Sequence, residues 1–306
     1  MLDIWYARVG AAKPFLKWAG GKTQLLFEQP DLFPHFEGRY IEPFLGGGAA
    51  FFFQMKRHNH PCRARLGDTN LGLIKTFIAV RDRPEELADS LEALQAGFDG
   101  ALDKEAFYYA LRDQFNGTWD EGSASRFIFL NQTCWNGLFR VNRAGSFNVP
   151  FGSRRTGRVI PSREALESAA AALAQADIRA TSWQNTVALA EPGDFVFLDP
   201  PYFSDVARGD VKYQKRMFTK RHHEELADSL VSLAMRGIDF VLTNSAEAEM
   251  VDLYAARGLD LELVHLPRSI NSRSDRRARA AEVIVRPGTG APVATNLDAE
   301  VLLHEI

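Results

Sequence analysis

Seven short apolar stretches along the chain have the length and composition of β-strands. They lie at residues 39–42, 64–67, 178–181, 195–198, 239–243, 261–266 and 281–285. Several are continuously apolar, which is typical of strands covered on both faces. Helical periodicity separates most of them, at 49–57, 186–190 and 222–235. This alternation predicts an α/β fold with a mostly parallel sheet and helices on both sides.

One long interval breaks the alternation. Between Asp68 and Ile178 the apolar spacing is mostly helical, at 85–94, 104–115, 125–130 and 163–175. This interval is too long for a simple crossover, so we expect it to hold an inserted, mainly helical subdomain. The predicted organisation is a main domain of residues 1–74 and 177–286, an insertion of 75–176 and a C-terminal tail of 287–306.

Composition narrows the class of protein. The chain has 306 residues, of which 46% are hydrophobic and 25% charged, as in an ordinary globular protein. It has neither the roughly 20 consecutive apolar residues of a membrane span nor the N-terminus of a secretory signal. Two cysteines, Cys62 and Cys134, are too few for a disulfide framework or a zinc site. We therefore expect a cytoplasmic protein.

The distribution of charge is more informative than its sum. The net charge of −3 predicts no general affinity for nucleic acid. Residues 131–160, however, contain five arginines and no acidic residue, with aromatic residues between them. Because salt confines electrostatic fields to about 10 Å, this segment predicts a local patch that can bind a polyanion.

Three consecutive glycines join a predicted strand to a helix in YIEPFLGGGAAFFFQM, at residues 46–48. Glycine permits backbone angles and a close ligand approach that a Cβ would block. The turn therefore predicts an adenosyl site, with Asp68 holding the ribose about 20 residues later; the alternative is a purely structural turn. A dinucleotide motif would need glycine where Phe51 stands, and Phe44 would crowd a pyrophosphate. This favours S-adenosylmethionine, which has no phosphate.

A second glycine pair, in LKWAGGKTQLL, resembles the end of a phosphate-binding P-loop. That motif requires a first glycine where this chain has Leu16, and a buried strand before it. The preceding residues contain Pro14 and few β-branched side chains. An ATPase is therefore a minor alternative.

The stretch GDFVFLDPPYF leads a hydrophobic strand into Asp199, Pro200, Pro201 and Tyr202. Ligands bind at the carboxyl edge of a parallel sheet, so we expect these residues to face the same crevice as the glycine turn. The prolines stiffen the turn and remove two N–H donors, which leaves acceptors beside an aromatic face. Two acceptors that hold the hydrogens of an exocyclic amine favour a localised lone pair on its nitrogen. The tetrapeptide thus predicts methyl transfer to a nucleobase amine, without a covalent intermediate or a metal.

Four rival interpretations remain open from the residues. Cytosine-C5 methylation needs a nucleophilic cysteine, and Cys62 follows a proline but has no supporting motif. Cytosine-N4 methylation uses the same chemistry, although a serine commonly replaces the aspartate there. A non-catalytic nucleic-acid-binding relative would not need the tetrapeptide. His222 and His223 suggest a metal site, but adjacent helical residues point about 100° apart, so we expect no metal.

Taken together, the motifs resemble the Dam family of DNA adenine-N6 methyltransferases, in its D12 class. The cofactor motif comes first, the target-recognition region second and the catalytic motif third. The similarity spans about residues 13–285 and rests on KPFLKWAGGKTQLL, YIEPFLGGGAAFF, GDTN, FLNQTCWNGLFRVNRAGSFNVPFG, GDFVFLDPPY and LTNS. It implies a Rossmann-like S-adenosylmethionine-dependent methyltransferase fold, with a seven-stranded sheet whose last strand is antiparallel and an inserted target-recognition subdomain.

The resemblance also implies roles for individual residues. The tetrapeptide would hold a flipped-out adenine of double-stranded DNA, with Asp199 also near the cofactor. The S-adenosylmethionine site would comprise Trp18, Gly20, Gly21, Lys22, Glu42, Pro43, Phe44, Gly46, Gly47, Gly48, Asp68 and Asp199. DNA contacts would come from Asn136, Leu138, Phe139, Arg140, Asn142, Arg143, Asn148, Pro150, Arg154 and Arg155.

Arg140 matches a family position that reads a base, and the other arginines would grip phosphates. Relatives commonly have an acidic and an aromatic residue where this chain has Ser182 and Trp183, so Trp183 is a candidate to stack on the cofactor's adenine. GATC is the default target, and a monomer that acts in a bacterial or phage-infected cell, with or without a cognate restriction endonuclease, is expected.

Overall fold

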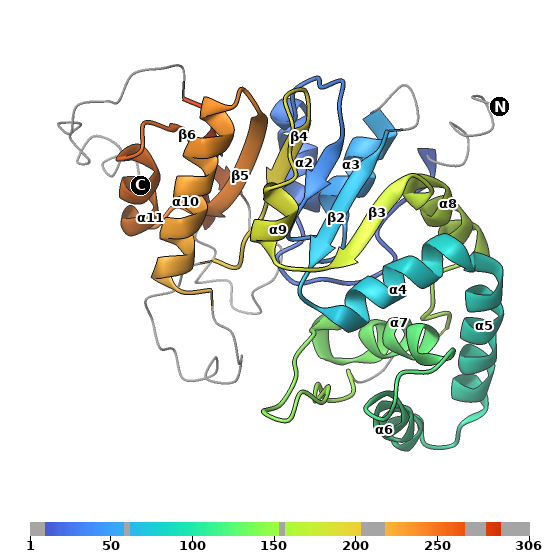
Figure 1. Cartoon of the computed structure of the whole chain (residues 1–306). Helices are drawn as coiled ribbons and strands as arrows, with labels where there is room; N and C mark the ends of the chain where they lie inside the picture. Colours follow the sequence, from blue (N-terminus) through green and yellow to red (C-terminus); the bar gives the residue numbers. More distant parts are fainter. Residues whose placement is uncertain (1–9, 58–61, 153–156, 203–217, 267–279, 289–306) are drawn as a thin grey trace. The chain divides into compact units, whose positions relative to one another are not determined.

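The computed structural model describes residues 10–57, 62–152, 157–202, 218–266 and 280–288. Its strands form a seven-stranded sheet in the order β3-β2-β1-β4-β5-β7-β6 (Figure 1). Their bounds are β1 Tyr40–Glu42, β2 Ala64–Asp68, β3 Ala176–Ala180, β4 Phe195–Leu198, β5 Asp239–Ser245, β6 Asp260–Leu266 and β7 Ala280–Arg286. Every predicted strand is present. The pairs β2–β3, β1–β4 and β4–β5 are parallel, and β7 is antiparallel to both of its neighbours. The predicted fold class is confirmed.

Contacts divide the chain into two compact units. The first comprises the described residues of Met1–Phe27 and Glu42–Thr186. The second comprises those of Glu28–Ile41, Val187–Val206 and Met217–Ile306. The predicted division into a main domain, an insertion and a tail stays a prediction, and the tail from residue 289 lies outside the described residues.

The first unit is built on β2 and β3. Helix α4, which Asn70 caps by accepting a hydrogen bond from Leu73 N, packs on both strands and on α7 and α8. Helices α5 and α6 extend the layer by packing on α7. The bounds of this unit's helices are α2 Thr23–Glu28, α3 Ala49–Arg57, α4 Leu71–Asp82, α5 Pro84–Gly100, α6 Lys104–Phe115, α7 Ser123–Thr133, α8 Arg163–Leu173 and α9 Trp183–Val187, with a short 3-10 turn η2 at Trp135–Gly137.

One helix of this unit lies elsewhere than predicted, and one was not predicted. The predicted helix at 186–190 is instead α9, Trp183–Val187, because Ser182 begins the helix by accepting at its carbonyl from Thr186 N. Helix α4 was not predicted at all. Its residues are apolar on most sides, and all but its ends are enclosed by strands and helices, so its sequence shows little amphipathic periodicity.

The second unit has an aromatic core. Phe33, Phe36, Tyr40 and Phe195 lie with ring centroids 5.2 to 6.4 Å apart. At the entrance to β4, Asp194 accepts hydrogen bonds from the Arg39 guanidinium and main chain, the shortest at 2.7 Å. Helix α10, Lys220–Met235, packs on β5, and α11, Ala248–Ala255, packs on β6. A 3-10 turn η1, Pro30–Leu32, precedes the aromatic cluster.

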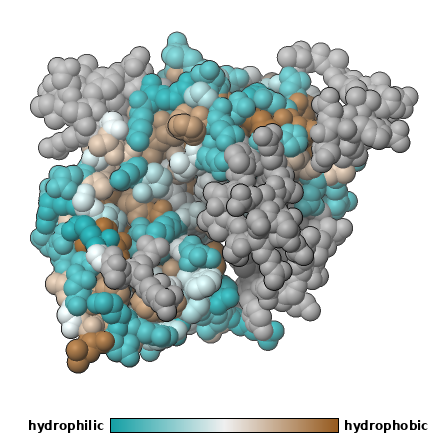
Figure 2. Space-filling view, turned by 180° about the vertical axis from the view of Figure 1, so that it is seen from behind, coloured by the Kyte–Doolittle hydropathy of each residue, from teal (hydrophilic) through white to brown (hydrophobic). Residues whose placement is uncertain are grey.

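On the face shown in Figure 2, hydrophobic residues appear in small separate groups among hydrophilic ones. Large exposed apolar side chains among the described residues include Phe27, Leu102 and Met235, which belong to three different helices or loops. Scattered exposure of this kind is normal for a globular surface. Among the described residues, no helix is both long and apolar enough to span a bilayer.

Candidate active site

The glycine turn connects β1 to α3 and is fixed by the end of β2. Gly46 and Gly48 have φ angles of 47° and 72°, a region that side chains other than glycine rarely adopt. Asp68 Oδ2 accepts from Gly46 N at 3.1 Å, and Leu45 N donates to Gly67 O at 2.9 Å. The glycine turn and Asp68, which the sequence assigns to one ligand site, are therefore in direct contact.

Asp68 is itself held by the main chain. Its Oδ1 accepts from Asn70 N at 2.8 Å, so each carboxylate oxygen has a backbone donor. Burial raises the pKa of Asp68 above its usual value, and the hydrogen bonds from Asn70 and Gly46 partly offset this effect. The site thus contains a half-buried carboxylate close to the glycine turn.

Trp18 packs against the same turn. A Cβ at Gly46 would lie 2.9 Å from the indole ring, and one at Gly47 would lie 2.8 Å from Trp18 Cβ. Because real Cβ atoms do not approach this closely, both positions require glycine. The segment that contains Trp18 and the glycine turn therefore pack directly on each other.

The other predicted cofactor residues surround these two segments. Gly20 has a φ of 78°, and its carbonyl accepts from Lys22 Nζ at 3.1 Å; Lys22 is 6% exposed. Glu42 is 2% exposed, and Pro43 after it is buried. Phe44 stacks on Trp183 with centroids 6.4 Å apart, so the chain has an aromatic ring beside the turn although Ser182 stands where relatives have an acidic residue.

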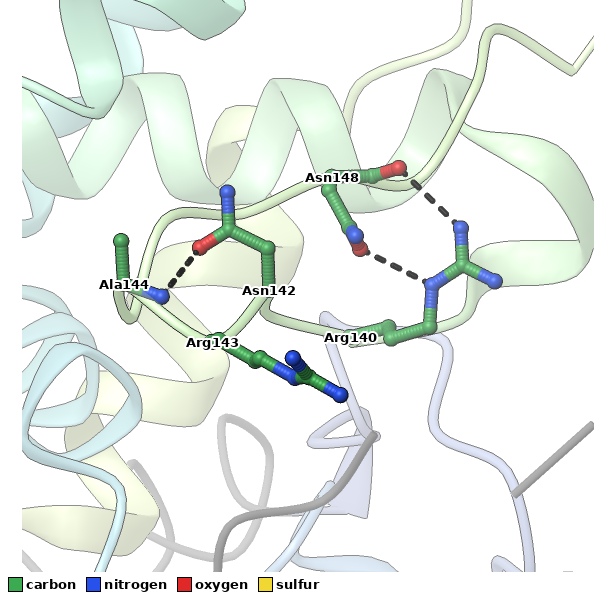
Figure 3. Close-up of a pocket in the computed structure, with 5 residues that line it drawn as sticks. All are labelled: Arg140, Asn142, Arg143, Ala144 and Asn148. Atoms are coloured by element: carbon green, nitrogen blue, oxygen red, sulfur yellow. Dashed lines mark hydrogen bonds between the residues drawn. The ribbon is translucent and has the colours of Figure 1, made fainter. Parts of the chain in front are cut away.

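The predicted DNA-contacting loop follows α7 and η2. An isolated antiparallel bridge pairs Val141 with Phe147, and Asn142 Oδ1 closes the turn between them by accepting from Ala144 N at 2.9 Å and Ser146 N at 3.0 Å. Arg140 donates from Nε to Asn148 Oδ1 at 2.9 Å and from Nη2 to Asn148 O at 3.2 Å (Figure 3). These bonds fix the plane of an exposed guanidinium.

An open pocket of about 530 Å³ lies at this loop, and Arg140, Asn142, Arg143, Ala144 and Asn148 line it (Figure 3). Four of these five residues were predicted to contact DNA. Leu138 and Pro150 are also exposed, Phe139 is half-buried, and Asn136 has a φ of 52°, which is unusual for a residue other than glycine. Arg154 and Arg155 lie outside the described residues.

Asp199 follows β4 directly and is held by the neighbouring strand. Leu198 pairs with Leu242, so the next residue of β5, Thr243, lies beside Asp199, and its Oγ1 donates to Asp199 Oδ1 at 3.1 Å. Thr243 is fully buried. Thr243 belongs to LTNS, a segment that carries the family resemblance, but its local sequence indicates no role for it.

The end of the tetrapeptide is more exposed than its start. Pro200 is buried, whereas Pro201 and Tyr202 are exposed. Desolvation, followed by the charges of Asp199 and Glu282, raises the pKa of Tyr202 well above its usual value. The phenol therefore stays neutral at any working pH and offers an uncharged aromatic face.

The cysteines and histidines that suggested other functions lie in environments that do not support those functions. Cys62 and Cys134 are both free thiols and are buried. His222 accepts at Nδ1 from Thr219 N at 2.9 Å in the cap of α10, whereas His223 lies inside the unit beside Asn244. Among the described residues, no group of three His, Cys, Asp or Glu side chains could hold a metal ion.

A seven-stranded sheet with an antiparallel strand, a glycine turn after β1, an acid after β2 and Asp-Pro-Pro-Tyr after β4 together define an α/β methyltransferase. The family model of the D12 class N6 adenine-specific DNA methyltransferases matches residues 18–268, and the chain belongs to this family.

Curated relatives agree with the family. The chain is 33% identical over 279 residues to the type II methyltransferase M.MjaIII of Methanocaldococcus jannaschii, which covers 87% of this chain and 95% of that protein. It is 31% identical over 284 residues to the DNA adenine methylase of Escherichia coli K12, covering 92% and 98% respectively. The chain is thus an enzyme that methylates the N6 amine of adenine in DNA, and the cytosine and non-catalytic alternatives are set aside.

Proposed function

We propose that the methyl donor is S-adenosylmethionine, held at the glycine turn of the first unit. The observation that carries this proposal is the bond from Gly46 N to Asp68: this N–H, which a phosphate would need, already donates to a carboxylate. Two acidic side chains, Glu42 and Asp68, also make the surroundings unfavourable for an anionic ligand and suitable for a cationic one with hydroxyl groups.

In this proposal Asp68 accepts from the ribose hydroxyls, and Trp18, Phe44 and Trp183 supply the apolar walls. The remaining contacts would come from Gly20, Gly21, Lys22, Glu42, Pro43 and the glycines at 46–48. When bound, this donor supplies a methyl group on a positively charged sulfur, which is electrophilic without any further activation. The chain's task is then to bind and orient the two reactants.

Asp199 would orient the accepting amine. Thr243 donates to Oδ1 of this carboxylate, whose two oxygens can accept several hydrogen bonds, and in this proposal the carboxylate also accepts a hydrogen from the adenine N6 amine. The carboxylate also stabilises the positive charge that develops on nitrogen as its bond to the methyl carbon forms. Tyr202, neutral and 38% exposed, can stack on the flipped base, which is worth ~1–3 kcal/mol.

Site choice would rest on the loop after α7. Arg140 uses two N–H groups on Asn148, and its others can donate to a guanine edge, a contact worth about 1–3 kcal/mol of discrimination. Arg143, Arg154 and Arg155 would contact phosphates, with Asn136, Leu138, Phe139, Asn142, Asn148 and Pro150 completing the surface. We propose GATC or a closely similar site as the target.

The proposal is tested by expressing the protein in cells that lack adenine methylation and by mapping N6-methyladenine in their DNA by long-read sequencing. In parallel, the purified protein and an Asp199→Ala variant are incubated with tritiated S-adenosylmethionine and a duplex that contains the mapped site. We expect one methylated motif, transfer of label by the wild type, and loss of more than 99% of the activity in Asp199→Ala with donor affinity retained. Undiminished transfer by Asp199→Ala would overturn the assignment of Asp199.

We further propose that the enzyme acts as a monomer in the cytoplasm, where prokaryotic and phage DNA is found. A restriction partner is a second proposed association, supported by the words "type II" in the name of the relative from Methanocaldococcus jannaschii. Size-exclusion chromatography with light scattering tests the first point. Protection of methylated DNA from an endonuclease encoded beside the gene tests the second.

A further inference from the structure

One buried side chain joins the segment that would hold the methyl donor to the loop that would read DNA. Asn131, near the end of α7, is 3% exposed. Its Oδ1 accepts from Lys17 N at 2.8 Å, and its Nδ2 donates to Lys17 O at 2.7 Å. The same Nδ2 donates to Gly137 O at 3.2 Å. Asn131 thus pairs with both main-chain groups of the residue before Trp18 and with the loop that leads to Phe139 and Arg140.

The two segments approach each other as closely as their backbones allow. Gly137 has a φ of 64°, and a Cβ there would lie 2.4 Å from Lys17 Cβ. Gln132, next to Asn131, donates from Nε2 to Phe15 O at 3.0 Å, and its own carbonyl accepts from Lys17 Nζ at 2.9 Å. The main chain of residues 15–17 is therefore held by hydrogen bonds from two successive side chains of one helix.

Stacked aromatic side chains also join the donor-binding segment to the recognition loop. Trp18, which packs on the glycine turn, also stacks on Phe139 with centroids 5.7 Å apart and planes 18° apart. Phe139 in turn stacks on Phe127 of α7 at 5.5 Å and lies 5.7 Å from Phe147. A displacement of Lys17 and Trp18 would therefore change both the wall of the glycine turn and the support beneath Arg140.

We propose that Asn131 is a positioning residue that keeps the donor-binding segment in register with the target-recognition loop, so that one carboxamide serves both sites. The inference rests on the proposed donor site and recognition loop, and it adds a residue to which neither assigns a role. Its physical basis is the low exposure of Asn131. Without this side chain, Lys17 N–H, Lys17 C=O and Gly137 C=O would lose partners in a place that water does not easily reach.

The chain contains a matched control. Asn116, at the end of α6, makes the same pair of hydrogen bonds to the main chain of one residue. Its Nδ2 donates to Phe147 O at 3.0 Å, and its Oδ1 accepts from Phe147 N at 2.7 Å. Phe147 belongs to the recognition loop, and the bonds of Asn116 reach no residue of the donor-binding segment. Asn116 therefore tests what is lost when a carboxamide supports the loop alone.

The experiment compares Asn131→Ala, Gln132→Ala and Asn116→Ala with the wild type. Isothermal titration calorimetry measures the Kd of S-adenosylhomocysteine without DNA, and fluorescence anisotropy measures the Kd of a duplex that carries the mapped site. We expect Asn131→Ala to raise both Kd values about tenfold or more. Asn116→Ala should raise the duplex Kd and leave the S-adenosylhomocysteine Kd within about twofold.

Thermal unfolding of each variant separates positioning from folding. If Asn131→Ala lowers Tm but leaves both Kd values unchanged below its Tm, or if Asn116→Ala weakens S-adenosylhomocysteine equally, the inference is overturned. Should Asn131→Ala not fold, Gln132→Ala takes its place, because Gln132 is half-buried and its side chain donates to Phe15 O. Both Kd values raised about threefold would support the inference, and two unchanged Kd values would overturn it. Failure of the wild type to bind S-adenosylhomocysteine would instead overturn the proposed donor.

Discussion

At the scale of single residues, the carboxylate of Asp199 accepts a hydrogen bond from the uncharged hydroxyl of Thr243 at 3.1 Å. We expect Thr243→Val, which keeps the shape of the side chain, to lower kcat about 10- to 100-fold, because hydrogen bonds to charged groups are worth ~1.5–3 kcal/mol. Thr243→Ser should retain most of the rate. Steady-state methylation assays measure kcat and KM, and the KM for the donor should stay within about twofold.

The buried position of Thr243 makes stability the necessary control for this prediction. Removing the hydroxyl also deprives Asp199 of a donor, so a Tm below that of Thr243→Ser is expected. A Thr243→Val enzyme with the wild-type kcat would show that the carboxylate is oriented without the hydroxyl, and Thr243 would then be only a packing residue of β5.

At the scale of elements, three polar side chains meet between α10, β5 and α11. Asn244 Nδ2 lies 3.4 Å from His223 Nδ1 and donates to Tyr254 OH at 3.1 Å. Burial, with a smaller contribution from His222, lowers the pKa of His223 to about 4. The unfolded chain therefore binds this proton more tightly than the folded one, and stability falls as pH falls from about 6.5 to about 4.

His223→Gln removes this titration while keeping a polar group. Between pH 7 and pH 5 we expect the variant to lose about 2 kcal/mol less of its free energy of unfolding than the wild type loses. Urea denaturation at the two pH values measures the difference, and comparison of the two proteins cancels the titration of groups common to both. Equal losses in both proteins would contradict a depressed pKa at His223.

Elements and site residues differ in how far the sequence alone predicts them. Strands such as β4 were found because FVFL is wholly apolar and bounded by Gly193 and Pro200. The glycine turn and Asp68 were found because the conformational freedom of glycine and the spacing of a carboxylate are visible locally. Asn131 and Thr243 were not assigned roles, because an asparagine inside a helix and a threonine inside a strand are unremarkable until their partners, 114 and 44 residues away, are known.

At the scale of the whole molecule, a net charge of −3 coexists with the five arginines of residues 131–160. Two of these arginines have different environments in the structure. Arg158 pairs with Glu92 of α5 at 2.7 Å and donates to Pro161 O, whereas Arg143 lines the pocket beside Arg140. The expectation that the arginines other than Arg140 grip phosphates stays a prediction, but Arg158 already pairs with a carboxylate, so we expect it to contribute less to DNA binding than Arg143.

This difference can be measured through the salt dependence of DNA binding. Each phosphate that a cation neutralises contributes about −0.9 to the slope of log K against log salt concentration. We expect Arg143→Gln to make the slope shallower by about 0.9 and to weaken all duplexes alike, and Arg158→Gln, its control in the same segment, to leave the slope unchanged. Arg140→Gln should instead reduce the preference for the mapped site over a scrambled duplex about 10-fold or more, because base contacts and not phosphate contacts carry sequence information. Equal slopes for Arg143→Gln and Arg158→Gln would mean that the loop does not meet the DNA backbone through Arg143.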